Sequence, residues 1–310
     1  MPFEPAPALP DWLEPQLPHD RRQYRLVQGV DAGRALHFID HGDRDATAVV
    51  MLHGNPTWSF LWRKVIDRLP RRRCVAPDLL GLGLSSKLAR IDDHDIGRHA
   101  EALVELLDAL KLPRYVLVGQ DWGGAMLTAI GRLRPQQVAG VVLANTSVLV
   151  PTRPRTTAFH RFARMPWVSD LAFRGLGVPQ SMLWTAQGDK RSLLRGVSAR
   201  AYRWPLRRIR DRVAPLALAR MVPDHPDHPS MEPLRMGQAW IEGFDGPMAL
   251  VWGTRDPILG RALSRHERAF PRAPVTVTRA GHFLQEQVPG ALAVAIEDVI
   301  ARSAAPPQAR

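Results

Sequence analysis

The sequence predicts an α/β fold, a mostly parallel, doubly wound sheet that is interrupted by a helical insertion. Short apolar runs recur along the 310 residues and alternate with segments of helical pattern. The run at 48–52 is entirely apolar, as a central strand of a parallel sheet should be. Between about 150 and 240 this alternation stops, and prolines, arginines and short helical patterns replace it.

The expected elements follow in a regular order. Residues 1–20 are rich in proline and are expected to form an arm on the surface. Strands are predicted at 35–39, 48–52, 74–78, 114–118, 138–143, 248–253 and 275–278. The chain therefore divides into a first part of the core at 1–149, a helical lid at 150–240 and a second part of the core at 241–310.

The predicted lid contains Trp167, Trp184 and Trp204, and its last part includes a loop over 223–229 that holds three prolines. Its aromatic and aliphatic side chains are expected to roof an apolar pocket. Alternatively, the tryptophans only attach the lid to the core, and the sequence leaves both interpretations open.

The net charge is +12, with positive clusters at 71–73, 153–174 and 203–212. Such a charge fits an acidic partner, either nucleic acid or an anionic membrane surface. However, only four of the 42 basic residues are lysines, which indicates a general arginine bias. Since no nucleic-acid-binding module accompanies the charge, we expect no nucleic-acid partner.

Cys74 is the only cysteine, so no intramolecular disulfide is possible, and its apolar neighbours predict a small core residue. The N-terminus shows no signal peptide. No segment reaches the roughly 18 apolar residues that a membrane span needs. We therefore expect a cytoplasmic protein without a membrane span.

The segment Gly119–Gly124, Gly-Gln-Asp-Trp-Gly-Gly, carries the first chemical signal. A strand precedes it and a helix follows, which is the pattern of the nucleophile elbow in α/β-hydrolases. Asp121 occupies the nucleophile position. A carboxylate there forms an ester with an electrophilic carbon, which water then hydrolyses. The expected target is a saturated carbon bearing a halogen or an epoxide oxygen.

Two further groups follow predicted strands, Asp256 in Trp-Gly-Thr-Arg-Asp-Pro and His282 in Ala-Gly-His-Phe. The order nucleophile, acid, histidine is the α/β-hydrolase order. The carboxyl ends of parallel strands converge on one crevice. His282 is the expected base that activates water, and Asp256 would orient it and stabilise its charged form.

The loop after strand 48–52 begins His-Gly-Asn-Pro-Thr-Trp-Ser. In this fold such a loop supplies one backbone amide of the oxyanion hole, and the residue after the nucleophile supplies the other. These amides would belong to Asn55 and Trp122. Their side chains also carry N–H donors that suit a halide, although Trp122 could be packing and Asn55 a turn former. His53 is expected to be structural.

Three segments, His53–Arg63, Pro77–Lys87 and Gly119–Gly124, together resemble haloalkane dehalogenases. The resemblance extends over roughly 25–300 and is weakest in the lid. It implies Asp121 as nucleophile, His282 as base, and Asn55 with Trp122 as halide ligands.

Some members of that family place the acid after the strand that precedes the lid. The corresponding position here is about Asn145, which is not acidic, so Asp256 is the predicted acid. A late Asp combined with an Asn halide ligand is similar to the third subfamily. That group also includes relatives that decarboxylate β-lactones to olefins.

The sequence thus predicts hydrolytic dehalogenation of a small apolar halogenated substrate, with halide and water as the other ligands. No metal or organic cofactor is expected, because no Cys/His cluster would hold a metal. The alternatives are a β-lactone decarboxylase, an epoxide hydrolase and a non-catalytic binding protein. The epoxide hydrolase is disfavoured because the lid offers one tyrosine, Tyr202, where two are normally needed. Substrate length and oligomeric state are left open.

Overall fold

The computed structural model describes residues 2–150, 157–187 and 195–304. Arg153, the first residue of the second basic cluster, lies outside the described residues, as does Lys190. The strands are β1 (Phe3–Pro5), β2 (Arg21–Arg25), β3 (Ala35–His41), β4 (Ala48–Leu52), β5 (Arg73–Pro77), β6 (Tyr115–Asp121), β7 (Val138–Thr146), β8 (Met248–Gly253) and β9 (Val275–Thr278). The helices are α1 (Arg63–Ile66), α2 (Ile96–Ala109), α3 (Trp122–Leu133), α4 (Ala158–Ala163), α5 (Val168–Asp170), α6 (Val178–Ser181), α7 (Gly196–Arg203), α8 (Val213–Arg220), α9 (Met231–Glu242), α10 (Leu263–Ala269), α11 (Leu284–Gln287) and α12 (Pro289–Ala304).

One sheet of nine strands forms the centre, in the order β1-β2-β3-β5-β4-β6-β7-β8-β9. The six strands from β5 to β9 in this order run parallel to one another, whereas β1, β2 and β3 are antiparallel additions at the β5 edge. Every strand predicted from the sequence is present. The predicted α/β class is confirmed.

The N-terminal segment contributes to both the sheet and the core. β1 pairs with β2 and extends the sheet, and Leu13 and Leu17 are fully buried. The sequence missed β2 because its residues, Arg-Arg-Gln-Tyr-Arg, contain a single apolar side chain. β2 lies between β1 and β3, and its pairing with both depends on backbone hydrogen bonds rather than on apolar side chains. The segment predicted as an arm over 1–20 thus packs on the core through these leucines, and its first residues extend the sheet as β1.

Two cores lie on opposite faces of the sheet, because successive side chains of a strand point to opposite sides. Val50 belongs to the core beneath α2 and α3, and Val49 belongs to the core beneath α12. α9 also covers the first face, where a Cβ on Gly131 of α3 would collide with the Trp240 ring of α9 at 2.2 Å. Cys74 is buried in the second core, as predicted.

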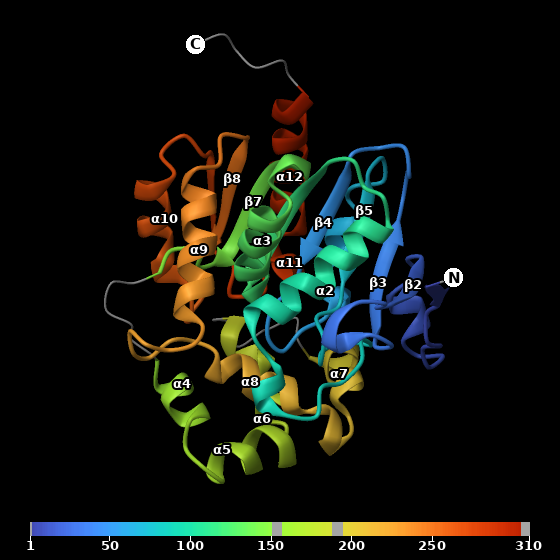
Figure 1. Ribbon diagram of the computed structural model, residues 1–310, viewed down its shortest axis with the longest axis vertical. Coiled ribbons are helices and arrows are strands. Elements are labelled where there is room, and N and C mark those ends of the chain that lie inside the picture. Colours follow the sequence, from blue (N-terminus) through green and yellow to red (C-terminus); the bar gives the residue numbers. More distant parts are fainter. Residues whose placement is uncertain (1, 151–156, 188–194, 305–310) are drawn as a thin grey trace.

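The helices α4 to α8 form a separate layer beyond the end of the sheet (Figure 1). The loop over 223–229 follows them, as predicted. The predicted lid boundary at 240 lies inside α9, which packs on α3 of the core. We therefore propose that the lid ends before α9. Within the part of the chain that the structure describes, no helix has the length and apolar character to cross a membrane.

Candidate active site

The turn between β6 and α3 is as sharp as the motif predicts. Asp121 adopts φ 52° and ψ −125°, which is unusual for a residue with a side chain. A Cβ on Gly123 would lie 2.0 Å from the Leu52 carbonyl oxygen, and one on Gly119 would lie 2.7 Å from the Gly123 carbonyl oxygen. Only glycines allow this close approach of backbone segments, so the turn can present Asp121 beyond the sheet.

The Asp121 carboxylate lies against backbone amides. Its Oδ1 accepts a hydrogen bond from the Asn55 N–H at 2.8 Å, and the Trp122 backbone N–H is also hydrogen-bonded to the carboxylate. Burial raises the pKa of Asp121, although His282 and the two amides favour its charged form. Both amides predicted to build an oxyanion hole therefore point at this side chain.

His282 lies between the two predicted carboxylates. Its Nδ1 donates to Asp256 Oδ2 at 2.9 Å, and its Nε2 lies 3.6 Å from Asp121 Oδ2. Burial disfavours a charged imidazole, but Asp256 and then Asp121 outweigh it and raise the pKa of His282. The bond to Asp256 fixes the proton on Nδ1, so neutral His282 presents the Nε2 lone pair toward Asp121.

Asn145, the alternative acid position considered from the sequence, connects the loops of this site. Its Oδ1 accepts from the Gly253 N–H at 2.8 Å, and its Nδ2 donates to the Gly281 carbonyl at 2.9 Å. Asn145 therefore joins the end of β8, which precedes Asp256, to the loop that carries His282.

The two predicted halide ligands differ in their surroundings. Asn55 Nδ2 donates to the Pro215 carbonyl of lid helix α8 at 2.9 Å, and this amide has a second hydrogen. The buried Asn55 Oδ1 has no hydrogen-bond partner within the described residues. Trp122 is buried next to Asp121, and its indole N–H is a second possible donor to an anion. A small anion would satisfy such donors.

Two glutamines beside His282 were not identified from the sequence. Gln120 Nε2 lies 3.1 Å from His282 Nε2 and donates to the His282 carbonyl at 3.2 Å. Gln187 of the lid receives the Phe283 N–H on Oε1 at 2.9 Å and donates to the Phe283 carbonyl at 3.2 Å. The position of Gln120 before the nucleophile was a usable signal, whereas nothing local marks Gln187.

The lid backbone touches the histidine loop directly. The His282 N–H donates to the Ala186 carbonyl at 2.9 Å. A Cβ on Gly281 would lie 2.3 Å from the Gln187 Cα, so this glycine allows the contact. The position of His282 therefore depends on lid residues that lie almost 100 positions earlier in the chain.

Neither of the two interpretations of the lid tryptophans fits Trp167, whose side chain is 87% exposed. Trp184 is also exposed, and Trp204 packs edge-to-face on Trp12 of the N-terminal segment. His53 is structural in its contacts, because its Nε2 accepts from the Leu79 N–H and its Nδ1 donates to the Gly54 carbonyl. Among the described residues, no group of three or more His, Cys, Asp or Glu side chains could hold a metal ion.

Known proteins match both the fold and the sequence. The chain matches the family described as alpha/beta hydrolase fold over residues 47–289. It is 33% identical to a haloalkane dehalogenase of Mycobacterium marinum, covering 81% of this chain and 84% of the relative. It is 31% identical to haloalkane dehalogenase 2 of Mycobacterium tuberculosis, covering 91% and 96%.

A solved structure agrees with these relatives. The haloalkane dehalogenase DbeA of Bradyrhizobium elkani superimposes with a TM-score of 0.78 at 26% identity, covering 92% of this chain and 98% of that one. The agreement in sequence and fold extends over the core and the lid. The chain therefore belongs to the haloalkane dehalogenase family of the α/β-hydrolase fold.

Proposed function

We propose that this protein hydrolyses the carbon–halogen bond of small apolar haloalkanes and releases an alcohol and a halide ion. The proposal rests on the contacts of the two Asp121 carboxylate oxygens. One carboxylate oxygen is held by a backbone amide, and the other faces His282. This arrangement separates a nucleophile from the base that later activates water.

In the first step, the free Asp121 Oδ2 attacks the carbon that bears the halogen. The new carbon–oxygen bond forms as the carbon–halogen bond breaks, and the halide leaves with the bonding electrons. The second hydrogen of Asn55 Nδ2 and the Trp122 indole N–H stabilise the developing charge. No base is needed, because a carboxylate is already an anion at neutral pH.

In the second step, His282 Nε2 takes a proton from water, and the hydroxide attacks the ester carbon of Asp121. The negative charge then develops on Oδ1, beside the Asn55 and Trp122 amides. Asp256 stabilises the imidazolium that forms. When the intermediate collapses, the alkoxide leaves and takes the proton from His282. Asp121 then carries the proton of the added hydroxyl group, and its release to solvent restores the starting carboxylate.

The contacts of Tyr202 argue against epoxide opening. Its hydroxyl donates to Glu286 Oε1 at 2.6 Å and is fully buried there, so this tyrosine faces Glu286 and not Asp121. The named relatives favour carbon–halogen chemistry over the decarboxylation of β-lactones. A cytoplasmic location remains a prediction, which cell fractionation tests.

The decisive experiment replaces the base. His282→Phe should form the ester with a brominated alkane but fail to hydrolyse it, because only the second step needs a base. Intact-protein mass spectrometry should show one alkyl group, and peptide mapping should place it on Asp121. Asp121→Asn is the matched control and should form no such adduct.

Substrate choice is tested on the wild-type protein with brominated alkanes of several lengths and with a cis-dialkyl β-lactone. Bromide release that requires Asp121 supports the proposal. Rapid olefin formation with background bromide release would assign the protein to the decarboxylases. If neither substrate is turned over and no adduct forms, the mechanism is wrong for this chain.

A further inference from the structure

The positive charge of this protein is concentrated in one part of the chain. Residues 150–240 contain 16 basic and six acidic residues, and therefore hold +10 of the net +12. The other 219 residues contain 26 basic and 24 acidic residues. A general arginine bias would raise the positive charge along the whole chain. It therefore does not explain why the charge is concentrated in residues 150–240.

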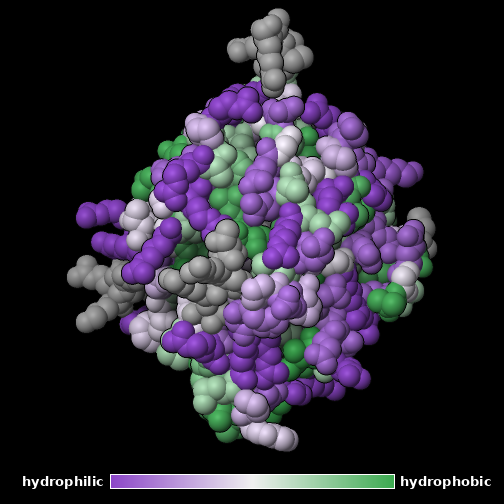
Figure 2. All heavy atoms as spheres, turned by 60° about the vertical axis from the view of Figure 1, so that its left-hand side comes forward, coloured by the Kyte–Doolittle hydropathy of each residue, from purple (hydrophilic) through white to green (hydrophobic). Residues whose placement is uncertain are grey.

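The same region exposes apolar side chains at its outer end. We define the lid tip as Trp167, Val168, Leu171, Leu176 and Ile209, which are 49% to 87% exposed. The Arg212 side chain donates to the carbonyls of Arg174 and Gly175, and so holds the segment with Ile209 against the segment with Leu171. Figure 2 shows hydrophobic side chains at this lower end of the molecule, with hydrophilic ones around them.

Cationic side chains surround the tip. Arg208 and Arg210 flank Ile209, and both are exposed. No described residue forms an ion pair with Arg208, and the nearest carboxylate oxygen to Arg210, on Asp211, is 4.0 Å away. These guanidinium groups are therefore available to a ligand beside the apolar surface.

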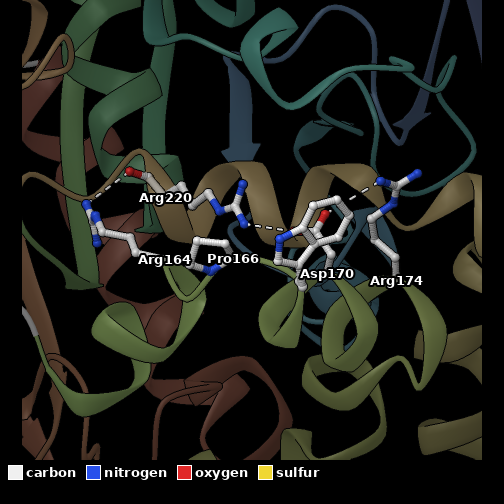
Figure 3. A pocket seen from close by; sticks show the side chains of 6 residues that line it. Arg164, Pro166, Asp170, Arg174 and Arg220 are labelled. Carbon is white, nitrogen blue, oxygen red and sulfur yellow. Dashed lines mark hydrogen bonds and ion pairs between the residues drawn. The ribbon is translucent and has the colours of Figure 1, made fainter.

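A hollow of about 600 Å³ opens next to Trp167 (Figure 3). Arg164, Arg174 and Arg220 line it together with Asp170. Arg220 and Arg174 share that carboxylate at 3.0 and 3.6 Å, and the Arg174 Nε has no partner among the described residues. Two guanidinium groups around one carboxylate leave a net positive charge for an anionic group.

We propose that the lid tip docks on the surface of an anionic lipid bilayer. Exposed aliphatic and tryptophan side chains insert at the boundary between headgroups and acyl chains. The surrounding arginines attract anionic headgroups, and each cation near such a surface strengthens binding about fivefold. The hollow beside Trp167 offers donors to a lipid phosphate.

Charge complementarity favours a bilayer over the other occupants of this surface. A second copy of the chain would bring another lid of the same positive charge against the tip, which like-charge repulsion opposes. Single-stranded nucleic acid would use aromatic platforms for stacking, but Trp167 is the only aromatic residue of the tip. Aliphatic side chains framed by arginine fit lipid better.

The test is co-sedimentation of the full-length protein with vesicles. One set contains phosphatidylcholine alone and the other contains one-quarter phosphatidylglycerol. We expect binding to the anionic vesicles that is at least tenfold tighter than to the neutral ones. Added salt should weaken this binding without abolishing it, because the apolar part is not screened. The readout does not involve turnover, so it is independent of the proposed reaction.

Variants separate the two contributions. The double variant Trp167→Ser/Leu171→Ser should bind at least tenfold more weakly, and Arg208→Gln/Arg210→Gln roughly twentyfold more weakly. The matched controls are Val27→Ser/Val30→Ser, which removes exposed apolar side chains of the core, and Arg114→Gln/Arg272→Gln, which removes the same charge elsewhere. Both controls should bind like the wild type.

Three results would overturn the proposal. The first is equal binding to both vesicle types or to neither. The second is a loss of binding in the control variants that matches the loss in the tip variants. The third is tighter binding to a short DNA duplex at the same salt than to the anionic vesicles, which would assign the charge to nucleic acid. Circular dichroism of each variant excludes misfolding as the cause.

Discussion

The core and the lid of this protein differ in where they place charge. The core holds nearly balanced charges, and several of its acidic and basic groups form ion pairs, such as Arg63 with Glu286 and Arg73 with Asp40. The lid holds most of the excess positive charge, and it exposes apolar side chains that the core would bury. The core therefore contributes the reacting groups, while the lid positions them and faces outward.

Lid residues contact the predicted active site at a few positions. The Pro215 carbonyl orients the Asn55 side chain, and Ala186 with Gln187 holds the loop of His282. Replacements in the core should therefore reduce chemistry most, and replacements at these lid contacts should reduce it less. The predictions below test that ranking.

The largest effect is expected for Asp256→Asn. The change removes the charge that supports His282 and offers an N–H where Nδ1 needs an acceptor, so turnover should fall about 10⁴-fold. Steady-state bromide release measures it. Asn145→Ala is the control, because it should mainly lower stability by about 1–3 kcal/mol through the loss of buried hydrogen bonds. The opposite ranking of the two losses would reassign the acid.

Trp122→Phe should have the next largest effect. The phenyl ring keeps most of the packing but has no N–H for the departing halide, so halide release should slow by about 100-fold. Pre-steady-state measurement of bromide release tests this, and halide quenching of tryptophan fluorescence should weaken in parallel. An unchanged rate of halide production would remove Trp122 from the halide site.

Gln187→Ala tests the lid contact. The change leaves the Phe283 N–H and carbonyl unpaired and loosens the loop of His282, so turnover should fall about tenfold with KM nearly constant. Gln180 is a matched control, because it is a buried lid glutamine whose amide has no partner among the described residues. Similar losses in Gln187→Ala and Gln180→Ala would mean that the lid acts only through its overall stability.

The smallest expected effect is a shift in the pH dependence of activity. His282 must be neutral to take a proton from water, and Asp256 and Asp121 raise its pKa, so activity should fall as pH drops through a value above the ordinary one for histidine. Formation of the ester neutralises Asp121, which removes part of this upward shift. When ester hydrolysis limits turnover, the acid limb of kcat should therefore lie at lower pH than the pKa of His282 in the free enzyme, which NMR titration of the imidazole measures. Equal values would contradict the coupling between Asp121 and His282.

The sequence identified the elements that local chemistry marks. β4, β8 and β9 have the predicted bounds, because each is an apolar or β-branched run between turn residues. Asp121, Asp256 and His282 stand in short motifs that follow strands, and the convergence of those strands follows from the parallel topology. Candidate functional residues at the ends of central strands can therefore be predicted from the sequence.

The sequence could not predict which lid side chains face solvent. The sequence left open whether the lid tryptophans roof a pocket or attach the lid to the core, and the Trp167 side chain instead faces solvent. Composition cannot tell an inner from an outer apolar face when the helices are short, because α4, α5 and α6 have at most six residues and show no clear periodicity. The direction of each side chain depends on how these segments pack on α8.

The sequence by itself determined the fold class, the haloalkane dehalogenase resemblance and the three groups proposed to react, because motif spacing and strand order fix them locally. Only the tertiary structure decided that Gln187 and Ala186 hold the histidine loop, that Asn145 joins two loops, and that Asn55 contacts Pro215. These contacts join residues about 100 or more positions apart. An amide side chain has no sequence signal for a distant partner, since the approach of the two backbones is set by packing.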